Sequence, residues 1–325
     1  MSSVCASRVF GHHFRAAAAA AIPAFLKDFA NVRDNLKRGP VHHAAADGFT
    51  DACKYFLKDL KLDVNEKDDL NKTPLIYAAE HGHTATAKFL VDYGAALEFE
   101  RGRYPLLYAA KKGDIELMKS LLSKGAKADF VNRDFSTSLS QAALSGQPDA
   151  CRLLLENGAN PNGHPDYPSF SPIGLAIRSC SLPCVQVLVE ANATLNSPAT
   201  SWEGNPLHQA AYFGHQEIVK YLLENGADPN IKCVTRFSDD DVWKPRKPIQ
   251  VAAQYGKVGV VKVLFPHTTP IKGYTEWSID RILGDMQPGS LRRGGGTWKR
   301  KEKGQSREDA LRKGKKSLDQ RKGAY

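Results

Sequence analysis

A short pattern returns seven times along this chain at nearly even spacing. Its clearest copy reads TPLIYAA at residues 73–79. The proline of each copy, or its equivalent, stands at position 40, 74, 105, 138, 172, 206 or 248, which gives intervals of 34, 31, 33, 34, 34 and 42 residues. A period of roughly 20–50 residues is typical of repeat proteins, whose units cannot bury their apolar faces alone. The repeat therefore predicts a solenoid with a core shared between neighbouring units.

Each copy also carries the signals for two helices. Thr73, Ser171 and Asn205 can cap a helix, and the proline after each suits the first helical position. Glycine at positions 48, 82, 113, 146, 214 and 256 ends this helix, where a left-handed residue is needed. A second apolar helix follows, and in the sixth unit it stops at Gly226. We expect each unit to be a helix, a turn, a second helix and a hairpin-like loop.

The pattern resembles the ankyrin repeat, which has a period of about 33 residues and a T-P-L-H-x-A core. The expected fold class is an all-α ankyrin-repeat solenoid of about seven helix-turn-helix units with short hairpin loops. Residues 264–271 and 277–280 are similar to the end of the ankyrin block in plant ankyrin–tetratricopeptide proteins. This resemblance covers residues 39–287 and implies a cap helix after the last repeat.

The chain divides into four segments on this interpretation. Residues 1–38 form an Ala-rich segment and a capping helix, 39–273 the repeats, 274–287 a second capping helix and 288–325 a basic, mostly disordered tail. One face of the first capping helix is expected to carry Phe25, Phe29, Val32 and Leu36. Residues 1–27 contain no Asp or Glu, so a transit peptide is an alternative to a frayed helical start.

The net charge of +10 belongs to the tail. Residues 288–325 hold 13 Lys/Arg and 4 Asp/Glu, whereas residues 1–287 hold 32 and 31. The stretch 310–322 faintly resembles the first helix of a tetratricopeptide unit, but the chain ends at Tyr325 before a second helix. A single helix of this kind has nothing to pack against. The peptide binding of tetratricopeptide repeats is therefore not expected here.

No pattern for catalysis occurs in the sequence. GxSxG, HExxH, the phosphate-binding Walker A pattern and a strand-linked GxGxxG are all missing. Cys180 and Cys184 lack the second close pair that a structural zinc site needs. Cys53 and Cys151 share with Cys184 an apolar second-helix position, where cysteine acts as a small buried hydrophobe. We expect no enzyme, no metal and no cofactor, and we expect His42 and His208 to be structural hydrogen-bonding residues.

The solenoid predicts a binding surface instead. The residue after T-P-L-H and the two after Ala-Ala are expected to face away from the second helix. These candidates are His43, Asp47, Tyr77, Glu80, His81, Tyr108, Lys111, Lys112, Gln141, Arg178, Gln209, Tyr212, Phe213, Gln254 and Tyr255. Loop tips add Asp69, Phe135 and Trp202, and an insertion of about nine residues before the seventh unit adds Trp243. The competing interpretation is that the aromatic side chains pack on neighbouring repeats and the charged ones are merely solvated.

We expect the concave groove and loop tips to bind another protein, with the chain acting as an adaptor or scaffold. The alternative is nuclear, nucleic-acid or anionic-surface association through the tail residues Lys299, Arg300, Lys301, Lys303, Lys313, Lys315 and Lys316. Trp298 is the one aromatic residue near these basic runs before Tyr325, which disfavours binding by base stacking. We expect a monomer without membrane insertion, located in the cytoplasm and, as a further location, the nucleus.

Overall fold

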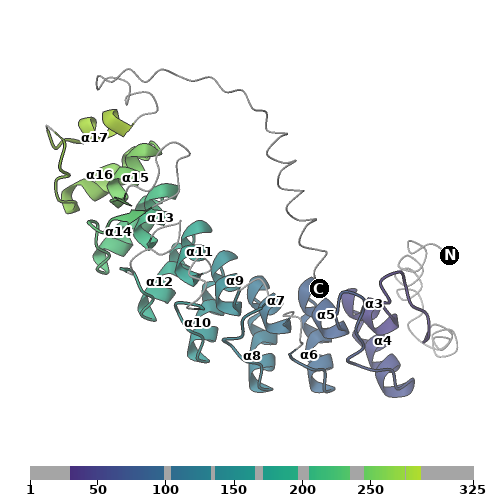
Figure 1. Ribbon diagram of the computed structural model, residues 1–325. Coiled ribbons are helices and arrows are strands. Elements are labelled where there is room, and N and C mark those ends of the chain that lie inside the picture. Colours follow the sequence, from purple (N-terminus) through teal and green to yellow (C-terminus); the bar gives the residue numbers. More distant parts are fainter. Residues whose placement is uncertain are drawn as a thin grey trace, which may run out of the picture. The chain divides into compact units, whose positions relative to one another are not determined.

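The computed structural model describes residues 30–98, 104–132, 136–164, 171–196, 205–234, 245–274 and 276–286. Over these residues the chain forms seven helix pairs, which follow one another in sequence order along a single row (Figure 1). The whole row lies in one compact unit, Met1–Gln287. The predicted solenoid of helical repeats is confirmed.

The first helix of every pair starts at the repeated proline position. These first helices are α3 (Pro40–Ala46), α5 (Pro74–His81), α7 (Pro105–Lys112), α9 (Ser138–Leu144), α11 (Pro172–Arg178), α13 (Pro206–Phe213) and α15 (Pro248–Gln254). Proline suits this position because the first helical N–H has no intrahelical acceptor in any case. The spacing of the prolines therefore sets the spacing of the helices.

The second helices form the other row of the stack. They are α4 (Thr50–Lys54), α6 (Thr84–Asp92), α8 (Ile115–Ser123), α10 (Pro148–Glu156), α12 (Leu182–Glu190), α14 (Gln216–Glu224) and α16 (Val258–Leu264). A π-helical turn (Tyr55–Asp59) extends α4, and a 3-10 turn (Phe265–His267) extends α16. First helices contact one another more closely than second helices do, since small alanine pairs such as Ala78-Ala79 and Ala210-Ala211 line their contacts.

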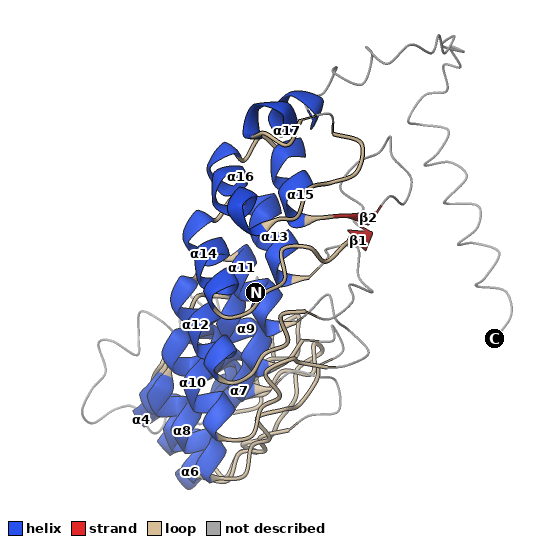
Figure 2. Ribbon diagram, turned by 90° about the vertical axis from the view of Figure 1, so that its left-hand side faces the viewer, coloured by secondary structure: helices blue, strands red, loops and turns tan. Residues whose placement is uncertain are grey.

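The connecting loops lie on one side of the helices (Figure 2). Between the sixth and seventh pairs, β1 (Cys233–Val234) and β2 (Pro245–Arg246) form a short antiparallel ladder with Cys233 opposite Arg246. This ladder stands at the base of the predicted insertion. The rest of the insertion, residues 235–244, lies outside the described residues.

Most of the expected helix signals are present. The Asn205 side chain accepts from His208 N at 3.1 Å and the Ser171 hydroxyl from Gly174 N at 3.4 Å. The prediction that the Thr73 side chain caps its helix is wrong, because its buried hydroxyl has no hydrogen-bond partner among the described residues. Gly82 has the left-handed φ of 83° that was expected. In the fifth repeat Cys180 takes that position with a φ of 57°.

The core runs through the whole stack without a break. Leucines and alanines of neighbouring first and second helices form one cluster of buried residues. Cys53, Cys151 and Cys184 are fully buried within it, as their register predicted. After the last pair, α17 (Ile279–Met286) packs on α15 and buries Ile282 in the same cluster. The apolar face of the seventh repeat is thus covered.

The start of the stack differs from expectation. Residues 30–38 contain turns and no helix, and Val32 and Leu36 are 43% and 38% exposed. The Asp34 carboxylate accepts hydrogen bonds from the N–H groups of Leu36 and Arg38, both at 2.9 Å. Such side-chain bonds to the backbone compete with helix formation. Phe25 and Phe29, the other two residues of the expected capping helix, lie outside the described residues.

Candidate partner-binding surface

The first helices end in a row of paired positions that runs along the stack, here called the end row. Its members are Ala46 and Asp47, Glu80 and His81, Lys111 and Lys112, Leu144 and Ser145, Arg178 and Ser179, Tyr212 and Phe213, and Gln254 and Tyr255. They follow the buried alanine pair, or its equivalent, of each repeat. That pair packs between neighbouring first helices, whereas the two positions after it lie at the end of this contact. The end row contains most of the residues that the sequence proposed for partner binding.

Repeats three to six carry the most exposed part of the end row. Lys111, Lys112 and Arg178 are exposed and form no ion pair with a carboxylate of any described residue. Leu144 is 37% exposed and Phe213 is 36% exposed. Large apolar side chains at this level of exposure, each one repeat after a cation, can supply contact area to a partner.

Tyr77 does not belong to this exposed surface, although the sequence placed it there. It is 5% exposed, and its hydroxyl donates a hydrogen bond to Asp68 Oδ2 at 2.7 Å. Burial, with this bond to Asp68, raises the pKa of Tyr77 to about 12. The Asp68 carboxylate also accepts from the N–H groups of Leu70 and Lys72, at 2.8 and 2.7 Å. Tyr77 therefore holds the loop before its own helix.

His43 contacts the Asp34–Arg38 ion pair. The Arg38 guanidinium donates to Asp34 Oδ2 at 2.7 Å, and His43 Nε2 lies 3.3 Å from the same oxygen. The same guanidinium lies 5.8 Å from the centre of the Tyr77 ring. Burial, helped by the nearby Arg38 charge, lowers the pKa of His43. We call Asp34, Arg38, His43, Asp68 and Tyr77 the N-terminal polar cluster.

His81 and Glu80 are accessible but held in place. His81 Nδ1 donates to the Tyr77 carbonyl at 2.9 Å, and its ring stacks on that of His83 with centroids 6.3 Å apart. Glu80 pairs with the Lys72 ammonium group. His83 Nε2 donates to the Ala46 carbonyl at 2.8 Å, so it links the second repeat to the first.

The end row of repeats six and seven presents aromatic rings. The Tyr212 ring meets those of Tyr255 and Phe213 edge-on, with centroid distances of 4.7 and 5.0 Å. Phe213 in turn stacks on His215 at 5.7 Å. These four residues form the C-terminal aromatic cluster. Phe213 is its most exposed member, whereas the tyrosines are half-buried.

In repeats six and seven, buried polar residues also hold the connecting loops to the helices. His208 Nε2 donates to the Arg246 carbonyl at 2.8 Å, and burial lowers the pKa of His208 to about 4. The Lys247 ammonium group donates to Asn230 Oδ1 at 2.8 Å and to the Thr269 carbonyl and hydroxyl at 2.9 and 2.6 Å. His42 makes the equivalent bond to the Lys72 carbonyl at 3.2 Å, so the structural role expected for both histidines is confirmed.

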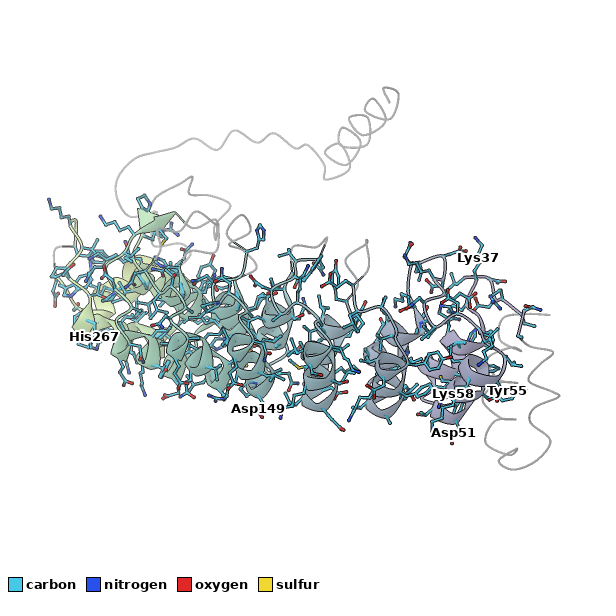
Figure 3. All side chains as sticks on the ribbon, turned by 90° about the horizontal axis from the view of Figure 1, so that it is seen from below. Lys37, Asp51, Tyr55, Lys58, Asp149 and His267 are labelled. Atoms are coloured by element: carbon cyan, nitrogen blue, oxygen red, sulfur yellow. The ribbon has the colours of Figure 1, made fainter. Side chains whose placement is uncertain are left out.

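The remaining candidates fall into four groups. Gln209 is buried against Gly174, where a Cβ would approach its amide oxygen to 2.8 Å, so its expected exposure is wrong. Tyr108, Gln141 and Gln254 are half-buried, whereas Asp47 and Asp69 are exposed. Asp69 pairs with Lys37 at 2.8 Å, at the edge of the stack opposite Asp51 and Asp149 (Figure 3). Phe135, Trp202, Trp243, Lys299, Arg300, Lys301, Lys303, Lys313, Lys315 and Lys316 lie outside the described residues.

Two features were missed by reasoning from sequence. Leu144 occupies the register of Lys111 and Arg178, and this register was the available signal, but the residues expected to bind a partner were polar or aromatic. Cys180 Sγ lies 3.3 Å from His215 Nδ1, a contact between neighbouring repeats that no spacing rule indicated. Within the described ranges no group of three His, Cys, Asp or Glu side chains is placed to hold a metal ion. No helix in those ranges is long and apolar enough to cross a membrane.

Comparison with known proteins decides the family. A family model described as ankyrin repeats (3 copies) matches residues 14–101, 97–164 and 163–233. A second, ankyrin repeats (many copies), matches residues 207–265. The chain belongs to the ankyrin-repeat family. Ankyrin repeats generally mediate protein–protein interactions.

Relatives share the repeats over part of their length. Human ankyrin repeat and SOCS box protein 6 is 32% identical over 111 residues, which are 32% of this chain and 26% of that protein. The mouse B-cell lymphoma 3 protein homolog is 32% identical over 142 residues, 43% of this chain and 30% of that protein. The chain thus spans 30% or less of these curated relatives. The crystal structure of the human ASB11 ankyrin repeat domain is 27% identical, with a TM-score of 0.60, and the match covers 72% of this chain and 100% of that chain.

Proposed function

We propose that this ankyrin-repeat protein is an adaptor or scaffold that binds a partner protein along its end row and the adjoining loops. The observation that carries the proposal is the exposed stretch of the end row from Lys111 to Phe213. Its cations form no ion pair with the described residues, and its apolar side chains lie outside the shared core. These side chains are not needed to hold the repeats together, so they remain available to a partner.

The packing of the stack supports a concave surface on this side. First helices contact one another more closely than second helices do. A stack of this kind bends toward its more closely packed row, which places the end row along the inner face. A stiff surface loses little conformational entropy on binding, so moderate contacts give useful affinity.

The proposal is tested by affinity capture with the full-length chain and two matched double variants. Lys112→Glu with Phe213→Ala alters the end row, whereas Lys119→Glu with Val258→Ala makes the same charge reversal and truncates an exposed apolar side chain on second helices. We expect the first variant to lose partners that the control retains. Equal capture by both variants would contradict the proposal.

A second candidate function rests on the charge of the tail. Residues 288–325 hold 13 Lys/Arg against 4 Asp/Glu, which suits a nuclear importer, nucleic acid or an anionic surface. Replacing Lys299, Arg300, Lys301, Lys303, Lys313, Lys315 and Lys316 by Gln in the full chain separates the two functions. Partners that disappear with these changes, and that bind with a steep salt dependence, belong to the tail.

Three further points are part of this proposal. The protein acts in the cytoplasm, with the nucleus as a second location when the tail is recognised. It works as a monomer without a cofactor. The similarity of residues 264–271 and 277–280 to plant ankyrin–tetratricopeptide proteins indicates the branch of the family from which the repeats derive. Cell fractionation and size-exclusion chromatography with light scattering test location and oligomeric state.

A further inference from the structure

We propose that the end row of repeats three to six recognises an extended acidic–apolar segment of a partner, with acidic and apolar side chains alternating about every third residue. This inference deepens the proposed function and rests on it. Four exposed side chains on consecutive first helices carry it: Lys112, Leu144, Arg178 and Phe213.

The end row of repeats three to six is positive because it contains Lys111, Lys112 and Arg178 and no Asp or Glu. Glu80, the acidic member of the preceding repeat, pairs with Lys72. Asp114, just after α7, accepts from Leu117 N at 3.0 Å and from the Thr84 hydroxyl at 2.5 Å. Lys111 and Lys112 therefore meet no opposing carboxylate among the described residues. An acidic partner segment supplies the missing charge, and such complementarity sets specificity and association rate.

The apolar members alternate with the cations from one repeat to the next, with Leu144 and Arg178 at the first of the paired positions and Lys112 and Phe213 at the second. Leu144 stands one repeat after Lys112, Arg178 one repeat after Leu144, and Phe213 one repeat after Arg178. The order along the stack is therefore cation, apolar, cation, apolar. A uniformly acidic partner would place carboxylates against Leu144 and Phe213. Those carboxylates would lose hydration and gain no ion pair or hydrogen bond in exchange. An alternating partner matches all four positions.

The step between repeats fits an extended chain. Packed helices stand about 8–10 Å apart, and an extended chain in the polyproline II conformation advances about 3.1 Å per residue with about three residues per turn, so every third side chain faces the same way. One repeat thus corresponds to about three partner residues. The favoured segment has an acidic residue, an apolar residue three positions later, a second acidic residue after three more, and a second apolar residue after a further three.

Fluorescence anisotropy with the full chain tests this register directly. The probes are a labelled Glu-Ser-Ser-Leu-Ser-Ser-Glu-Ser-Ser-Leu peptide and its reversed sequence. A peptide of the same composition with adjacent glutamates is the control. We expect one of the two ordered peptides to bind about tenfold more tightly than the control, and its binding to weaken as salt screens the charges. Equal binding of ordered and control peptides, or no binding of either ordered peptide, overturns the inference.

Charge-matched variants locate the contact. Lys112→Glu with Arg178→Glu should weaken ordered-peptide binding about tenfold, whereas Lys119→Glu with Lys262→Glu, on second helices, should change it less than about twofold. If both double variants lost peptide affinity equally, the effect would come from net charge alone, and the inference would be overturned. An oligonucleotide that competes at the same residues with equal affinity would also overturn it.

The chain's own acidic segment, Asp239–Asp241, is the alternative occupant of this surface. If replacing those residues by Asn strengthens peptide binding about tenfold, the segment occupies the end row and the inference of a separate partner is overturned. Failure of the peptides leaves the proposed function standing when partner capture still depends on Lys112 and Phe213. If the peptides fail to bind and partner capture does not depend on Lys112 and Phe213, both the inference and the proposed function are overturned.

Discussion

Repeats one and two differ from repeats six and seven in the use they make of the same positions. In the first two repeats, ionisable groups such as Asp68 and Tyr77 are buried and bonded to one another. In the last two, the buried His208 bonds to the Arg246 carbonyl, the rings of Tyr212, Phe213 and Tyr255 contact one another, and Phe213 stays exposed. Register places a side chain on the surface of a repeat, but the preceding loop decides whether that side chain is then covered. A residue at such a position is a candidate for partner binding only where no loop residue covers it or bonds to it.

The largest expected effect is at the N-terminal polar cluster. Asp68→Ala leaves the Tyr77 hydroxyl and two backbone N–H groups without their acceptor, so we expect a loss of about 3 kcal/mol in the free energy of unfolding. Asp63→Ala removes an exposed carboxylate that accepts from Asn65 N, at a cost of about 0.5 kcal/mol. Urea unfolding of both variants measures the contrast. Similar losses would mean that burial does not distinguish these loops.

A comparable effect is expected from pH in the sixth repeat. The pKa of His208 is about 4 in the folded chain, against an ordinary value of 6.5, so the unfolded chain binds its proton first as pH falls. The stabilisation is complete above pH 6.5 and is lost on acidification toward pH 4, to a total of about 3 kcal/mol. Unfolding curves at several pH values measure this slope.

The control for this pH dependence is an exposed histidine. His208→Gln should flatten the slope, whereas His267→Gln should leave it unchanged. An unaltered slope in His208→Gln would show that other groups cause the acid sensitivity.

The next effect concerns the buried lysine that fastens the seventh repeat. Lys247→Met leaves the oxygens of Asn230 and Thr269 without their charged donor, and we expect a loss of about 2 kcal/mol in stability. Lys262→Met, on an exposed face of α16, should cost less than about 0.5 kcal/mol. Differential scanning calorimetry distinguishes the two. If both variants melt together, Lys247 is not the anchor of this loop.

The smallest effect on stability sharpens the comparison most for function. Tyr77→Phe removes one buried hydrogen bond and should cost about 1 kcal/mol while leaving partner binding unchanged. Phe213→Ala should cost about 0.5 kcal/mol because the ring is partly exposed, yet it should weaken partner binding. Thermal melts and affinity capture on the same samples separate the two roles. The reverse result would place the binding surface in the N-terminal repeats.

Sequence reasoning succeeded where one residue type meets one local requirement. Proline at the first helical position and glycine at the left-handed position set the helix starts and stops, and buried cysteines followed from register. It failed where a distant contact decided the outcome. The Asp68 side chain that covers Tyr77 comes from the preceding loop, and no spacing pattern records that bond. Asp34 likewise turns residues 30–38 away from a helix through its own side-chain bonds to the backbone.

Photo-cross-linking tests the central claim most directly. A photoreactive residue is placed in the full chain at positions 144, 178 or 213 of the end row, or at positions 119, 152 or 262 on second helices. The account predicts that one partner protein is cross-linked from the first three positions and not from the second three. Equal cross-linking from both sets, or from the second helices alone, would contradict it.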